Sequence, residues 1–199
     1  MEAFSDGVFA IAITLLMLDL HPPESGDLWA GLIHEWPQFA AYLTSFVIIG
    51  IMWANHHSMF RRIVRSDRVL LFLNLVLLLW TSLLPFPTGL VARYLGAGGP
   101  NASTAEALYS VNLTLAAIAF SLVWFRAVHR NRLVDTQLTP RQQWATLARF
   151  SMGTLVYALT IAVAFAAPAV ALAIQFLLAL YYLFEQVRPA NADAETVAS

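Results

Sequence analysis

Polar side chains that could do chemistry stand at the edges of strongly apolar segments in this chain. Phe4, Ser5 and Asp6 open the first apolar stretch, and His56 and Asn74 stand in the second and third. A carboxylate at the start of a membrane-length segment is costly unless it has a partner. We therefore predict that Asp6 pairs with a histidine of the second stretch. The expected partner is His56, with the adjacent His57 as the alternative.

The same residue types could serve catalysis or metal binding, but their spacing argues against both. Ser5 and Asp6 are neighbours, and neighbours on a helix diverge by about 100°, so they cannot flank one imidazole of His56 as a triad requires. No G-x-S-x-G elbow is present. His56 and His57 do not face one another on a helix, and no H-E-x-x-H exists. We predict no enzymatic activity, no metal site and no cofactor. Two interpretations of the polar residues stay open: they join helices, or they take a direct chemical part.

A narrow apolar stripe follows Asp6. Ile11, Leu15 and Leu18 have the helical spacing i, i+4, i+7, and Thr14 lies beside them. Asp6 is about 140° away from Ile11 around such a helix. Asp6 should therefore face the inside of the subunit while the stripe faces elsewhere. A stripe of this kind meets lipid, meets another helix, or lines a hydrophobic constriction in a pore.

The composition indicates a membrane protein. Of the 199 residues, 59% are hydrophobic and 12% are charged, against about 45–50% and about 25% in soluble domains. The chain has no Cys, which excludes disulfides and thiolate chemistry. The formal net charge of −1 offers no basis for nucleic-acid binding. The first segment lacks a basic region and a cleavage site, so no cleaved signal peptide is predicted.

Six apolar stretches approach the roughly 20 residues that cross a bilayer. They cover residues 4–20, 39–60, 69–91, 105–128, 142–166 and 170–187. Breaks between these stretches are marked by Pro37, Pro168 and a Gly-rich loop at 96–100. A short interfacial helix is predicted over 27–36. We expect an all-α, polytopic fold with a six-helix transmembrane domain at 1–187 and a disordered cytoplasmic tail at 188–199.

Arginine placement predicts the topology. Basic residues gather in the loops after the second and fourth stretches and after the last one: Arg61, Arg62, Arg65, Arg68, Arg126, Arg130, Arg132, Arg141 and Arg188. The positive-inside rule places these loops and both termini in the cytoplasm, for a multi-pass protein of the cell's inner (plasma) membrane. The outer side then carries Glu24, Asp27, Glu35 and Glu106, and this acidic surface would concentrate cations modestly.

Several motifs resemble the transmembrane protein 175 family, which comprises endosomal and lysosomal potassium channels and their bacterial relatives. Phe4-Ser5-Asp6 opens the first helix as it does in that family. Further similarity in the second and third helices comes from Trp53, His56, Phe60, Asp67, Leu73-Asn74-Leu75 and Leu84-Pro85-Phe86. Family members usually have a basic residue a few positions before this triplet, whereas Met1 and Glu2 stand there in this chain and neither is basic. The second half of the chain is less distinctive.

The resemblance implies a fold and a function that spacing alone does not establish. It implies six transmembrane helices per repeat, and a homotetramer in the lipid membrane for a single-repeat chain. The first helices of four copies would line a central pore, with Ile11 as its narrowest ring, Leu15 and Leu18 on the next turns, and Thr14 as a polar layer. A structural network would comprise Phe4, Ser5, Asp6, Trp53, His56 and Asn74. Potassium would be the permeant ion, and His56 could add pH sensitivity.

Two other functions remain as alternatives. A proton-coupled secondary transporter could use Asp6 and His56 as a relay, and a membrane scaffold would need no transport at all. Transporters tend to have broken helices at mid-membrane and paired repeats, whereas the second half of this chain does not resemble the first. The potassium channel is therefore the preferred hypothesis.

Overall fold

The computed structural model describes residues 1–23, 26–128 and 140–187, and its elements are helices. They are α1 (Glu2–Leu15), a 3₁₀ turn η1 (Leu16–Asp19), α2 (Leu28–His34), α3 (Trp36–Phe60), α4 (Arg68–Leu83), α5 (Pro85–Tyr94), α6 (Gly99–Val128), α7 (Pro140–Ala166) and α8 (Pro168–Val187). The all-α prediction is confirmed. The tail at 188–199, the arginines 130, 132 and 188, and Glu24 lie outside the described residues.

Local signals explain where several helices begin. Asp27 caps α2, the short helix expected before the second span, because its carboxylate accepts from the Trp29 N–H at 3.0 Å. Asp67 caps α4 in the same way, accepting from Leu70 N–H at 2.8 Å. Pro37 stands in the first turn of α3, where no backbone donor is needed. These boundaries follow from the sequence.

The third predicted span is interrupted. Pro85 lacks a backbone N–H and its ring crowds the preceding turn, so α4 ends at Leu83 and the chain continues as α5. After α5 the chain turns at Gly98 and Gly99, whose positive φ angles of 67° and 72° suit glycine. The next helix starts at Gly99, earlier than the predicted start at 105.

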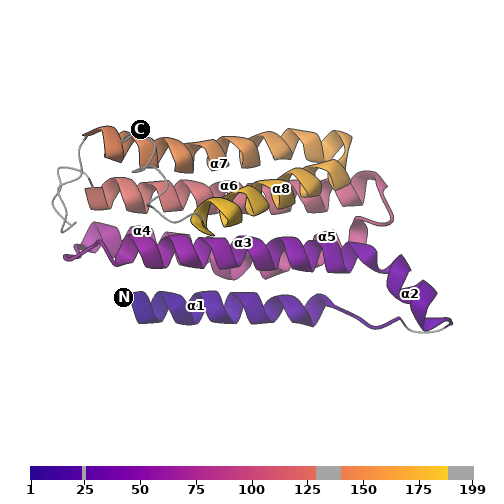
Figure 1. The fold of residues 1–199 in the computed structure, drawn as a ribbon. Helices are drawn as coiled ribbons and strands as arrows, with labels where there is room; N and C mark the ends of the chain where they lie inside the picture. The colour runs from indigo at the N-terminus through magenta and orange to yellow at the C-terminus, as the bar shows by residue number, and fades with distance from the viewer. Residues whose placement is uncertain (24–25, 129–139, 188–199) are drawn as a thin grey trace, which may run out of the picture.

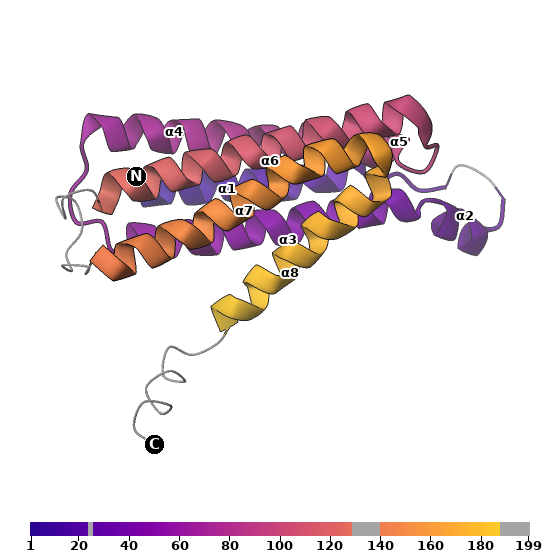
Figure 2. The same ribbon diagram turned by 90° about the horizontal axis from the view of Figure 1, so that it is seen from above.

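The helices form a layered bundle in which α1 and α7 lie at opposite sides (Figure 1). α1 packs on α3 and α4, and α6 packs on α4, α5 and α7. α8 runs diagonally away from the bundle toward its end (Figure 2). The largest core cluster includes Phe9, Leu16, Ile49, Tyr109 and Leu113. The buried face of α1 therefore looks toward α3 and α4, and its other face is left uncovered.

Three of the described helical segments are long and apolar enough to cross a membrane: Trp36–Phe60, Arg68–Tyr94 and Gly99–Val128. Met152–Ala166 and Pro168–Leu183 are apolar but shorter, and α1 with η1 is also shorter than the usual 20 residues. The chain is a multi-pass membrane protein.

Candidate functional site

A chain of three hydrogen bonds, two of them buried, joins α1, α3 and α4. His56 Nε2 lies 2.9 Å from Asn74 Oδ1, and Asn74 Nδ2 donates to Ser5 Oγ at 3.0 Å. Ser5 Oγ donates in turn to the backbone carbonyl of Met1 at 3.3 Å. Because the amide oxygen of Asn74 can only accept, His56 carries its proton on Nε2. All three side chains are buried, and the Asn74 amide accepts from His56 through its oxygen and donates to Ser5 through its nitrogen.

Aromatic rings surround the His56 imidazole. The Phe60 ring stacks on it, with centroids 4.1 Å apart and planes 17° apart. The Phe9 ring of α1 packs from another side at 5.3 Å. His56 is therefore a packed residue at the contact between α1 and α3, held by one polar partner and two rings.

The structure corrects the predicted pairing of Asp6 with His56. Asp6 Oδ1 instead accepts a hydrogen bond from the indole Nε1 of Trp53 at 2.9 Å. Trp53 precedes His56 by almost one helical turn on α3, so α1 meets both residues, at neighbouring depths. The prediction that Asp6 needs a partner from another segment is confirmed, and the choice of partner was wrong. The proton-relay alternative needs a direct contact between Asp6 and His56, whereas Asp6 bonds to Trp53 and His56 bonds to Asn74.

His57 takes a different partner at the same end of α1. Its Nδ1 lies 2.9 Å from Glu2 Oε1, and its ring stacks on Trp53 at 5.8 Å. Ligand-type atoms of Glu2, Asp6 and His57 all lie within 4.8 Å of one another. These side chains are half-buried, and they hold the first turn of α1 against the last turns of α3.

The opposite face of α1 is apolar and exposed. Ile11, Leu15 and Leu18 are 61%, 40% and 71% exposed. Phe4, which the resemblance placed in the network, is 61% exposed on this side of the helix instead. Ser5, Phe9 and Ala12 on the other side are buried. The prediction that Asp6 turns into the subunit while the stripe turns out is confirmed. We name this surface the α1 face: Phe4, Ile11, Leu15 and Leu18.

Thr14 lies on the exposed side of α1 between Ile11 and Leu15. Its hydroxyl donates to the Ile11 carbonyl at 2.9 Å, as threonine commonly does inside helices. The hydroxyl oxygen keeps its acceptor capacity, so Thr14 can still present a polar atom beside the apolar side chains of the α1 face.

A second buried polar cluster was not foreseen. Gln175 Nε2 of α8 donates to Ser110 Oγ of α6 at 2.8 Å and to Thr160 Oγ1 of α7 at 3.0 Å. The Glu106 carboxyl, one turn before Ser110, is fully buried, so its assignment to an acidic outer surface was wrong. The signal was available, since Glu106 and Ser110 are four residues apart and share one face of the fourth predicted span.

The fold and this site define a class of protein: a helical multi-pass membrane protein whose first helix is hydrogen-bonded to the rest of the subunit on one side and exposed on the other. Comparison with known proteins then identifies the family. Residues 1–85 match the family model "Endosomal/lysosomal potassium channel TMEM175". A protein of Streptomyces collinus named a potassium channel is 45% identical over 97% of this chain and 95% of its own length.

Two further relatives match nearly the whole chain. A protein of Chamaesiphon minutus, also named a potassium channel, is 36% identical over 91% of both chains. The crystal structure of a lysosomal potassium-selective channel TMEM175 homologue from Chamaesiphon minutus superposes with a TM-score of 0.82 at 33% identity, covering 94% of this chain and 96% of that one. The chain belongs to the TMEM175 family.

Proposed function

We propose that this protein is a potassium-selective channel in which four copies of α1 surround a central pore. The relatives that match nearly the whole chain are named potassium channels, and this supports ion transport rather than enzymatic catalysis. The ring of four Ile11 side chains is the constriction. Leu15 and Leu18 line the following turns, and Thr14 supplies a polar layer.

The α1 face is the single observation that carries this proposal. Three large apolar side chains of α1 and the following turn η1 are exposed in a row, while the reverse side of α1 is hydrogen-bonded to α3 and α4. The network of Ser5, Asp6, Trp53, His56 and Asn74 orients α1, so the direction of its bare face is set by the subunit. Closed cyclic symmetry then brings the four bare faces to one axis.

The proposed selectivity comes from partial dehydration. A ring of Ile11 side chains offers no oxygen atoms, so an ion must give up part of its water to pass. Potassium holds its water less strongly than sodium and passes more easily. Since no ligands replace the lost water, we expect moderate selectivity, and dewetting of the ring closes the pore.

The proposed topology has six crossings. They are α1 with η1, α3, α4 with α5, α6, α7 and α8. The Asp67–Arg126 ion pair and the Glu2–His57 contact support one shared end of the bundle for the start of α1, the α3–α4 connection and the end of α6. The arginines Arg61, Arg62 and Arg65 near that end favour the cytoplasmic side of the plasma membrane.

Replacing Ile11 tests the pore. Ile11→Asn puts a wettable side chain at the constriction, so sodium permeability relative to potassium should rise several-fold. The measurement is the reversal potential of purified protein in planar bilayers under a potassium–sodium gradient. The matched control is Leu155→Asn, because Leu155 is equally exposed at 61% and belongs to α7. The helix α7 lies on the opposite side of the bundle from α1 (Figure 1). An unchanged reversal potential with Ile11→Asn excludes Ile11 as the constriction.

A further inference from the structure

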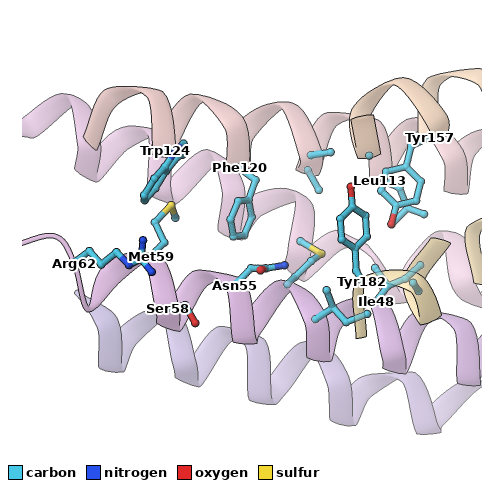
Figure 3. Close-up of a pocket in the computed structure, with 16 residues that line it drawn as sticks. Ile48, Asn55, Ser58, Met59, Arg62, Leu113, Phe120, Trp124, Tyr157 and Tyr182 are labelled. Carbon is cyan, nitrogen blue, oxygen red and sulfur yellow. The ribbon is translucent and has the colours of Figure 1, made fainter. Parts of the chain in front are cut away.

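A cavity of about 350 Å³ lies between α3, α6, α7 and α8 (Figure 3). Its size falls in the range of small-molecule sites. Its wall is mainly apolar and aromatic, and includes Ile48, Met52, Leu113, Phe120 and Trp124. α1 packs on another side of α3, so this cavity is separate from the α1 face (Figure 1). If α1 lines the central axis, the cavity lies on the side of α3 away from that axis.

The cavity is elongated and has one charged end. Arg62 lies at one end and Tyr157 at the other (Figure 3), and Arg62 is the only charged side chain among the described residues that line it. From Ile48 to Phe60 the α3 wall is about 18 Å long, and Arg62 follows just after the helix ends. Half of a bilayer's hydrocarbon core is about 15 Å thick. The apolar wall therefore has the length of a lipid acyl chain, with a cation where a headgroup sits.

The surroundings of Arg62 favour an anion. Arg61 and Arg65 stand in the same connection between α3 and α4. The acidic residue of that connection, Asp67, is paired with Arg126, and no acidic side chain is among the described lining residues. Basic pockets between transmembrane helices are sites for anionic lipid headgroups. A neutral hydrophobic ligand would offer no anionic group to the Arg62 guanidinium at the mouth of the cavity.

We propose that this cavity binds one acyl chain of an anionic phospholipid from the surrounding bilayer, and that the lipid phosphate binds Arg62. Long apolar and aromatic side chains of α3 and α6 contact the acyl chain. Met52 and Met59 line the cavity on α3, on either side of His56 in sequence. The bound lipid therefore packs against the helix that orients α1.

Trp124 in the cavity wall is an optical probe for this lipid. We reconstitute the full chain into phosphatidylcholine vesicles that contain a small fraction of acyl-brominated phosphatidylglycerol, or the same fraction of brominated phosphatidylcholine. The difference in quenching between the parent protein and Trp124→Phe isolates Trp124 from the other tryptophans. We expect brominated phosphatidylglycerol to quench Trp124 several-fold more than brominated phosphatidylcholine does.

Two arginine variants distinguish specific lipid binding in the cavity from general attraction of anionic lipid to a basic surface. Arg62→Gln should abolish the preference for phosphatidylglycerol, whereas Arg61→Gln, next in sequence and outside the cavity lining, should keep it. Ala117→Phe, from a half-buried lining position, fills the cavity and should lower quenching by both lipids. Size-exclusion profiles like that of the parent protein confirm folding of each variant.

Three results overturn the proposal. Equal quenching by the two brominated lipids means that Trp124 meets ordinary bilayer lipid. Equal loss of preference in both arginine variants means that charge attracts lipid without a site. No quenching of Trp124 means that acyl chains do not enter the cavity. None of these results depends on ion conduction, so the proposed channel function stands or fails separately.

Discussion

Asn74 is the residue through which α1, α3 and α4 are joined, since its amide serves His56 and Ser5 at once. Asn74→Leu leaves both buried side chains without that partner. We expect a loss of about 1–3 kcal/mol in total, seen as a fall of roughly 3–10 °C in the melting temperature of the detergent-solubilised protein. Asn101→Leu, at an exposed position of α6, is the control and should change little. Equal melting temperatures for both variants would mean that the network does not stabilise the subunit.

At the scale of elements, Asp67 connects the start of α4 to the end of α6. Its carboxylate accepts from the Leu70 N–H and pairs with Arg126. The Arg126 guanidinium, and then the Leu70 N–H, hold the pKa of Asp67 below its usual 3.8. A lowered folded-state pKa stabilises the protein above the unfolded value, and this contribution is lost as the pH falls through the folded pKa.

Asp67→Asn tests that linkage. Asparagine still caps a helix but carries no charge for Arg126. We expect the variant to melt a few degrees lower than the parent protein at about pH 5–8, and this difference should disappear as the pH falls below 3.8. Thermal melts across this pH range provide the measurement. A difference that stays constant down to acid pH would show that the charge of Asp67 is irrelevant to stability.

At the scale of the whole molecule, the assembly can be tested by cross-linking because the natural chain has no cysteine. Disulfides need Cα atoms about 4.4–6.8 Å apart. Convergence of four α1 helices on one axis, as proposed, would bring Cys residues at position 11 of neighbouring copies toward this range. We expect mild oxidation in membranes to give a cross-linked dimer on non-reducing gels. Leu155→Cys on α7 is the control, and it should stay monomeric. Cross-linking of Leu155→Cys but not of Ile11→Cys would place α7, and not α1, at the subunit contact.

The sequence determined the features that depend on neighbours along one helix. Pro37 indicates the start of α3, and Asp27 and Asp67 stand at the starts of α2 and α4, where each carboxylate caps its own helix. Helical periodicity separates Asp6 from Ile11, because each residue turns the helix by about 100° whatever surrounds it. The stripe of Ile11, Leu15 and Leu18 therefore follows from residue spacing alone, and the all-α membrane class follows from the composition and the length of the apolar stretches.

Only the tertiary structure decided which side chains meet across helices. Asp6 bonds to Trp53 and leaves His56 to Asn74, because the rotation and depth of α3 against α1 select among several polar residues that lie close together in sequence. Glu106 is buried, and the cavity beside Trp124 exists, for the same reason: both depend on how α7 and α8 pack on α6. Contacts between helices follow from packing, which a periodic pattern along one helix does not contain.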